Sequence, residues 1–263
     1  MKLNKLLGTG FSGSTYKIKK NGKFYAVKIQ HILKKDILNK KSQLWNEVKF
    51  YKYVSEYYPL FKKFYSYEII EDCKFKKNNQ SIGLKVSNKF QKKYKKLQDS
   101  NFCIQFITSY EENVLETIIN KLNEKEIYSL FLHLLFGIKI LQKRKYTHND
   151  FNYYNITYNK TKKKSMKIII NKKEYTIPIF NYIFTIIDYG GIEHISFIKT
   201  GKCREKYINK YKKQDLKNLI RNINMIWINE NKFIKKKDVK YMKDNLDNLN
   251  KIIKYFQDKI QNS

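Results

Sequence analysis

The feature that most constrains this chain is a short polar stretch, residues Thr147–Asn155, that follows a long apolar pattern. It reads Thr-His-Asn-Asp-Phe-Asn-Tyr-Tyr-Asn. Apolar residues recur at helical spacing across Ile127–Leu141, which predicts a helix there. His133 falls inside that pattern and is expected to be a packed side chain rather than a ligand. A polar stretch at the end of such a helix is typical of a functional loop held by a rigid element.

Three side chains in and after this loop form a distinctive chemical set. Asp150 precedes Asn155 by five residues, and Asp188 ends a later apolar run that begins at Ile183. An aspartate can accept a hydroxyl proton, while an asparagine and a second aspartate can hold a metal ion that bridges nucleotide phosphates. The set indicates phosphoryl transfer, so the rest of the chain should supply a nucleotide site.

The N-terminal segment offers such a site. Of only nine glycines, Gly8, Gly10 and Gly13 stand close together, and a β-hairpin is predicted after them around an Asn21-Gly22 turn. Glycines let backbone N–H groups approach phosphate oxygens closely. A dinucleotide-binding turn is disfavoured because it would place a helix directly after the glycines. Taken without their context, the glycines could equally form a flexible hairpin.

Lys28 is the one charge in the middle of the second strand of that hairpin. A helix is predicted over Ser42–Glu56, and Glu47 lies on it beside apolar neighbours. In the functional interpretation, Lys28 reaches the α- and β-phosphates and Glu47 holds it. The alternatives are an edge-strand lysine that points to water and an ordinary solvated glutamate.

Further elements follow from local patterns. Strands are predicted over Tyr67–Ile70 and Phe102–Ile107, a helix over Leu115–Leu122, and one or two helices across Val239–Ile260.

The charge of the chain is extreme. The 55 Lys and Arg residues against 23 Asp and Glu residues give a formal net charge of +32, while 42% hydrophobic residues argue against general disorder. The charge has two open interpretations, a solvated lysine-rich surface or affinity for polyanions such as nucleic acid or chromatin. Both apply to the lysine-rich stretch Lys74–Asp99, which contains Lys92, Lys93, Lys95 and Lys96.

The three cysteines are Cys73, Cys103 and Cys203. Their number is odd, they are widely spaced, and none belongs to a Cys-x-x-Cys pair. This pattern predicts neither a disulfide framework nor a zinc site, and it fits a reducing compartment.

No signal peptide pattern opens the chain, and no apolar run approaches the roughly 20 residues of a membrane-spanning helix. We therefore expect a soluble, intracellular protein of the cytoplasm or nucleus, or of a host cell or virion if it is viral. The excess of Lys, Asn, Ile and Tyr suits an AT-rich viral or parasite genome.

Taken in order, the motifs resemble those of the eukaryotic-type protein kinase family over nearly the whole chain. The matching segments are Gly8-x-Gly10-x-x-Gly13, Ala26-Val27-Lys28, Glu47, His148-Asn149-Asp150-x-x-x-x-Asn155 and Asp188-Tyr189-Gly190.

The resemblance implies an α+β, bilobal kinase-like fold. Residues 1–111 would form a β-rich N-lobe and residues 112–263 a reduced helical C-lobe of one kinase domain. It also implies ATP and Mg²⁺ as ligands. The glycines and Ala26 would contact the nucleotide, Lys28 and Glu47 would orient its phosphates, Asp150 would accept the hydroxyl proton, and the metal ligands would be Asn155 and Asp188.

The long connection between Asn155 and Asp188 predicts an inserted hairpin, with strands at Lys167–Ile170 and Glu174–Ile179. In this region the chain is similar to haspin-like atypical kinases and to kinases of large DNA viruses. The Asp-Tyr-Gly spelling is also similar to the vaccinia-related group.

Several positions depart from the family pattern. Asn149 replaces the usual arginine, so activity is expected to need no activation-loop phosphorylation. Asn152 replaces a usual lysine, Thr15 replaces a valine over adenine, and no Ala-Pro-Glu motif follows Gly190. Asp215 resembles the buried helix aspartate that braces the catalytic loop.

The predicted function is an ATP-dependent Ser/Thr protein kinase acting on a protein substrate. Two alternatives remain open. One is a pseudokinase, a basic scaffold that binds nucleic acid or partner proteins. The other is a small-molecule phosphotransferase of the aminoglycoside or choline kinase type, which the basic charge disfavours because those enzymes bind cations in acidic pockets.

Overall fold

The computed structural model describes residues 5–9, 13–73, 96–97, 99–194 and 204–262. Gly10, Cys203 and nearly all of the lysine-rich stretch lie outside the described residues. The chain is α+β and divides into two compact units, which we describe separately. Unit 1 comprises Met1–Glu56 and Lys62–Tyr110, and unit 2 comprises Tyr57–Phe61 and Glu111–Ser263.

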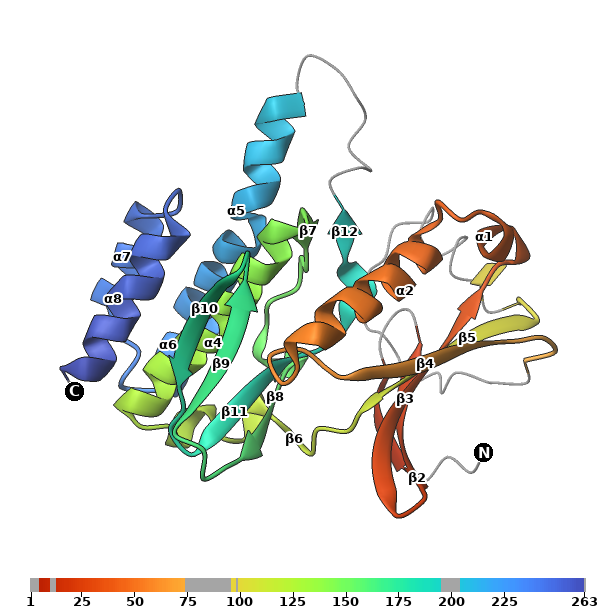
Figure 1. The fold of residues 1–263 in the computed structure, drawn as a ribbon, viewed down its shortest axis with the longest axis horizontal. Helices are drawn as coiled ribbons and strands as arrows, with labels where there is room; N and C mark the ends of the chain where they lie inside the picture. Colours follow the sequence, from red (N-terminus) through yellow and green to blue (C-terminus); the bar gives the residue numbers. More distant parts are fainter. Residues whose placement is uncertain (1–4, 10–12, 74–95, 98, 195–203, 263) are drawn as a thin grey trace. The chain divides into compact units, whose positions relative to one another are not determined.

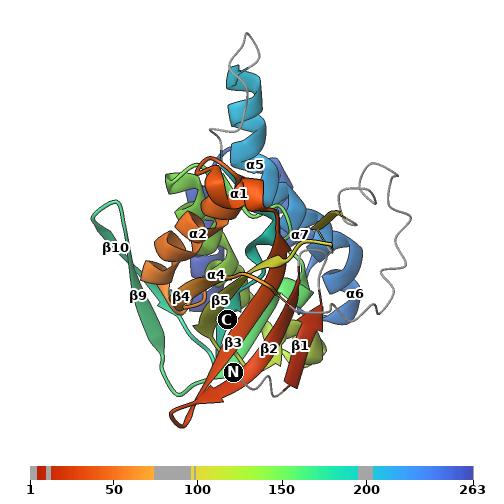
Figure 2. The same ribbon diagram turned by 90° about the vertical axis from the view of Figure 1, so that its right-hand side faces the viewer.

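Unit 1 is built on a five-stranded antiparallel sheet in the order β1-β2-β3-β5-β4 (Figures 1 and 2). The predicted hairpin is confirmed as β2 and β3, and Asn21 and Gly22 turn between them with positive φ angles of 50° and 77°. The two further predicted strands are also confirmed. The strands are β1 (Lys5–Thr9), β2 (Ser14–Lys20), β3 (Lys23–Ile32), β4 (Phe64–Ile70) and β5 (Phe102–Ser109).

Among the described residues of unit 1, one main helix packs on this sheet. After the short α1 (Lys34–Leu38), α2 (Gln43–Val54) confirms the predicted helix. Its buried face includes Tyr51, whose ring stacks on Phe106 of β5 with centroids 4.7 Å apart. This contact fixes α2 against β5, so the side chains on the same helix face point toward the sheet.

Unit 2 is organised around α4 (Glu124–Lys143), which contacts α8 (Leu249–Gln261) and α5 (Arg204–Asn222) (Figure 1). The predicted helix is confirmed and begins earlier, at a capping box in which Asn123 and Glu126 bond each other's backbone N–H.

His133 is packed inside α4 as expected. Its Nδ1 donates to the carbonyl of Ser129 at 2.7 Å, and burial lowers the pKa of its imidazole to about 4. The ring is therefore neutral near pH 7.

Other parts of unit 2 differ in detail from the predictions. Leu115–Leu122 forms two short 3₁₀ turns, η2 (Leu115–Thr117) and η3 (Ile119–Lys121), instead of one helix. The prediction of one or two helices across Val239–Ile260 is confirmed, since this region forms α7 (Lys236–Asp244) and α8. Between α5 and α7 lie η7 (Ile223–Trp227) and α6 (Ile228–Glu230). No helix within the described ranges is long and apolar enough to cross a bilayer.

The described strands of unit 2 form three small sheets. The predicted hairpin between Asn155 and Asp188 is confirmed as β9–β10, and alternate residues of β9 are buried and exposed. A second sheet has the order β11-β8-β6, and β7 pairs with β12. The strands are β6 (Asn113–Val114), β7 (Tyr146–Thr147), β8 (Ile156–Lys160), β9 (Ser165–Ile170), β10 (Lys173–Pro178), β11 (Tyr182–Ile186) and β12 (Glu193–His194).

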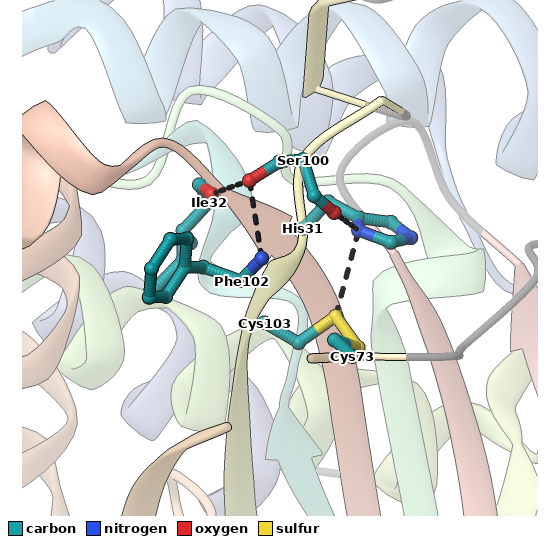
Figure 3. The surroundings of a disulfide bond; sticks show 6 residues. All are labelled: His31, Ile32, Cys73, Ser100, Phe102 and Cys103. Atoms are coloured by element: carbon teal, nitrogen blue, oxygen red, sulfur yellow. Dashed lines mark hydrogen bonds between the residues drawn. A yellow bond between two sulfur atoms is a disulfide. The ribbon is translucent and has the colours of Figure 1, made fainter. Parts of the chain in front are cut away.

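One prediction from the cysteine pattern is wrong, because Cys73 and Cys103 form a disulfide (Figure 3). The two residues are separated by 30 positions. The pairing of β4 with β5 sets Ile70 opposite Cys103, and Cys73 follows three residues later. Spacing along the chain could not reveal a contact that the sheet register creates.

Candidate active site

The loop predicted to carry the chemistry is held by one face of α5. The buried carboxylate of Asp215 accepts the backbone N–H of His148 with both oxygens, each at 3.0 Å, and that of Asn149 at 2.9 Å. Asn218 donates to the carbonyl of Asn149 at 2.9 Å, and Asn222 donates to that of Phe151 at 2.5 Å. Three side chains of one helix thus fix the loop backbone on both sides of Asp150.

The same contacts affect the pKa of the Asp215 carboxyl group beneath the loop. Burial raises the pKa of Asp215 to about 7, and the backbone N–H groups of His148 and Asn149 limit the rise. The backbone donors compensate in part for removing the carboxylate from water.

Asp150 lies exposed at the tip of the loop with its carboxylate oriented by two amides. Its Oδ1 accepts from Nδ2 of Asn152 and its Oδ2 from Nδ2 of Asn155, both at 2.7 Å. Asn152 also caps the short turn η4 (Tyr153–Asn155), since its Oδ1 accepts the backbone N–H of Asn155 at 3.1 Å. Asp150, Asn152 and Asn155 therefore form one hydrogen-bonded group.

Asp188 is attached to this group through the end of β11. The N–H of Ile187 donates to the carbonyl of Asn155 at 2.9 Å, and Nε2 of the buried His148 donates to the carbonyl of Ile187 at 2.9 Å. Asp188 follows directly. The structure thus brings Asp150, Asn155 and Asp188 together within unit 2.

Two residues of this assembly have left-handed backbone conformations. Asn149 has a φ of 66° and Asp188 a φ of 57°. Such conformations in non-glycine residues are uncommon, and they concentrate at functional sites where surrounding contacts enforce them. The side chain of Asn149 donates to the carbonyl of Gly191 at 2.9 Å, and Asp188 Oδ1 accepts the N–H of Gly190 at 3.3 Å. These bonds stabilise both turns.

Unit 1 contains the second half of the predicted set. Nζ of Lys28 contacts Oε1 of Glu47 at 3.1 Å, and Nε2 of Gln30 donates to Oε2 of Glu47 at 3.1 Å. Lys28 is 9% and Glu47 4% exposed. Both alternatives from the sequence are wrong: β3 lies between β2 and β5 rather than at an edge, and Glu47 is not solvated.

This buried ion pair needs an explanation beyond stability. Removing two charges from water costs several kcal/mol per ion, and apolar replacements of such pairs are often neutral or stabilising. A lysine held on a central strand by a helix carboxylate is instead suited to presenting a fixed positive charge to an anion.

The N-terminal glycines differ in how much space the structure leaves for a side chain. A Cβ on Gly13 would lie 2.1 Å from the carbonyl oxygen of Ile29, so the close approach of β2 and β3 requires glycine there. A Cβ on Gly8 would meet nothing within 4 Å. Gly10 lies outside the described residues. Ala26 is buried in β3, next but one to Lys28.

Sequence reasoning missed the asparagines that shape the loop. Asn218 and Asn222 stand three and seven residues after Asp215, and helical spacing puts all three on one face. That periodicity was visible in the sequence. The role of Asn152 could not be read from spacing, because it depends on the turn η4.

Comparisons with known proteins add no assignment. No protein-family model matches the chain, and no curated protein matches it either. Function must therefore be argued from the site.

We predict that Gly13→Ala destabilises the protein and that Gly8→Ala does not. The added methyl group of the first variant collides with backbone, and relieving the overlap requires strand displacement, typically costing about 1–3 kcal/mol. Chemical denaturation monitored by circular dichroism measures the difference. Equal midpoints for the two variants would contradict the structural role of Gly13.

Proposed function

We propose that this chain is an ATP-dependent protein kinase that transfers the γ-phosphate to a Ser or Thr hydroxyl of a protein substrate. The observation that carries the proposal is the assembly of Asp150, Asn155 and Asp188. Hydrogen bonds from α5 hold the loop of Asp150, and a backbone bond directly after β11 joins the Asp188 segment to Asn155. The buried Lys28–Glu47 pair supports it independently. In this proposal, units 1 and 2 are the N-lobe and C-lobe of a bilobal kinase-like fold.

The residues fit the ligands that the proposal requires. An amide oxygen and a carboxylate are hard oxygen donors of the kind Mg²⁺ prefers, so Asn155 and Asp188 would hold the ion. Mg²⁺, when bound, neutralises charge on the phosphates of ATP. Lys28, held by Glu47, would orient those phosphates, and Gly8–Gly13 would cover them.

Asp150 is the group that acts on the substrate in this proposal. It accepts the proton of the attacking hydroxyl and aligns that hydroxyl with the phosphorus atom. Its exposure leaves it accessible to a protein side chain, and the amides of Asn152 and Asn155 hold its orientation. Most of the rate acceleration then comes from positioning and charge neutralisation.

The two alternatives give different results in one assay. A pseudokinase scaffold would transfer no phosphate to any substrate, and a small-molecule phosphotransferase would modify an amino alcohol or aminoglycoside but not a protein. Incubation with labelled ATP, Mg²⁺ and casein, histone or these small molecules separates the three. Retention on heparin, measured alongside, tests whether the net charge of +32 confers affinity for polyanions.

We predict that Asp150→Asn lowers kcat about 10²–10⁴-fold, the usual effect of losing a general base, while Mg²⁺-dependent ATP binding is retained. Asp244→Asn, which alters an exposed aspartate at the end of α7, is the matched control and should keep full activity. Steady-state phosphorylation and equilibrium ATP binding provide the two measurements. Near wild-type kcat in Asp150→Asn would rule out the assignment of Asp150.

We also predict that Asn152 positions Asp150. Asn152→Ala should lower kcat about 10–150-fold with an unchanged KM for ATP, because a hydrogen bond to a charged group typically contributes about 1.5–3 kcal/mol. Asn152→Ser retains an oxygen that can cap η4 but has lost the amide donor to Asp150. We expect kcat to fall by the same factor in Asn152→Ala and in Asn152→Ser. Full activity of Asn152→Ser would show that only the cap matters.

A further inference from the structure

A second cluster of chemically active side chains lies in unit 1, apart from the residues assigned above. His31 of β3 is the register partner of Cys103 on β5, and Ile70, at the end of β4, pairs with Cys103 from the other side. Cys73 follows β4 closely. Three neighbouring strands thus deliver an imidazole and two sulfurs to one place (Figure 3).

The potential ligand atoms are close together. One imidazole nitrogen of His31 and the two cysteine Sγ atoms all lie within 4.8 Å of one another, and Nδ1 of His31 is 3.5 Å from Sγ of Cys103. Cys103 is fully buried in a cluster with Ile18, Val27 and Ile29, whereas Cys73 and His31 are partly exposed. The site is therefore rigid on one side and reachable from solvent on the other.

The disulfide bond between Cys73 and Cys103 does not need a histidine beside it in order to form. In the oxidised form, Nδ1 of His31 donates to the carbonyl of Ser100 at 3.1 Å and also contacts the sulfur of Cys103 (Figure 3). Histidine and cysteine in this proximity are the ligand types that bind zinc, and soft thiolates select zinc over the harder Mg²⁺ and Ca²⁺ ions.

We propose that the reduced protein binds one Zn²⁺ ion through His31 Nδ1, Cys73 Sγ and Cys103 Sγ, with solvent in the fourth position. A tetrahedral site with usual zinc bond lengths has an N···S edge of about 3.6 Å and an S···S edge of about 3.8 Å. The contact between His31 and Cys103, at 3.5 Å, already has that length. Reduction must separate the two sulfurs, whose residues have Cα atoms 5.7 Å apart, while the contact between His31 and Cys103 can keep its length.

The chemistry balances with an external thiol or phosphine as reductant. The reductant supplies two electrons and is itself oxidised, and the two sulfurs each take up a proton. Binding of Zn²⁺ then releases both thiol protons, and the Nδ1 proton of His31 transfers to Nε2 through solvent. The ion replaces the hydrogen bond to Ser100, so disulfide formation and zinc binding exclude each other.

The test uses the full chain carrying Cys203→Ser, so that Cys73 and Cys103 are the only thiols. The protein is reduced with a phosphine, freed of reductant and titrated with Co²⁺ as a spectroscopic probe, and then with Zn²⁺ against a chromogenic chelator. We expect one ion per chain, a thiolate-to-cobalt charge-transfer band and release of two protons. The disulfide form should give none of these signals.

Variants identify the ligands. His31→Gln should weaken Zn²⁺ binding to the reduced chain at least about tenfold, since even outer-shell changes cost 10–100-fold, while His194→Gln in unit 2 should not. Cys73→Ser should lower the intensity of the charge-transfer band by at least half, because only the Cys103 thiolate is left to bind cobalt, with folding checked by circular dichroism. A reduced chain without the band, or equal zinc affinity in His31→Gln, would overturn the proposal.

Discussion

The conformation of the loop that carries Asp150 depends on one buried carboxyl group, that of Asp215. Asp215 accepts the backbone N–H groups of His148 and Asn149, which would otherwise be left without these partners at a cost of about 1–3 kcal/mol each. These bonds hold the left-handed turn at Asn149, and the turn presents Asp150 to solvent. The position of the exposed Asp150 is thus determined by a carboxyl group buried beneath it.

Unit 1 also holds a buried ionisable group in a fixed position, and here that group is a cation. Lys28 is buried on a central strand, and its charge is tolerated because Glu47 lies beside it and Gln30 bonds the second carboxylate oxygen. Both arrangements bury an ionisable group, Asp215 to hold a loop backbone and Lys28 to hold its own ammonium group in place. Such arrangements are expected where a protein must present charge in a defined geometry.

Much of the fold was predictable from sequence because it depends on local patterns. The Asn21-Gly22 turn defined the first hairpin, and helical spacing defined α2 and α4. The disulfide was not predictable, because the register of β4 on β5 creates it. Glycine spacing suggested a phosphate contact at Gly13, yet the structure adds a packing requirement there that only the approach of β2 and β3 reveals.

We propose that the residues gathered around Asp150 hold metal and nucleotide for phosphoryl transfer. Isothermal titration of ATP into the full chain, with and without Mg²⁺, tests it most directly when wild type is compared with Asp188→Asn. The account predicts ATP binding that Mg²⁺ strengthens in the wild type, and loss of that Mg²⁺ dependence in the variant. No ATP binding by the wild type, or an identical Mg²⁺ dependence in both proteins, would contradict it.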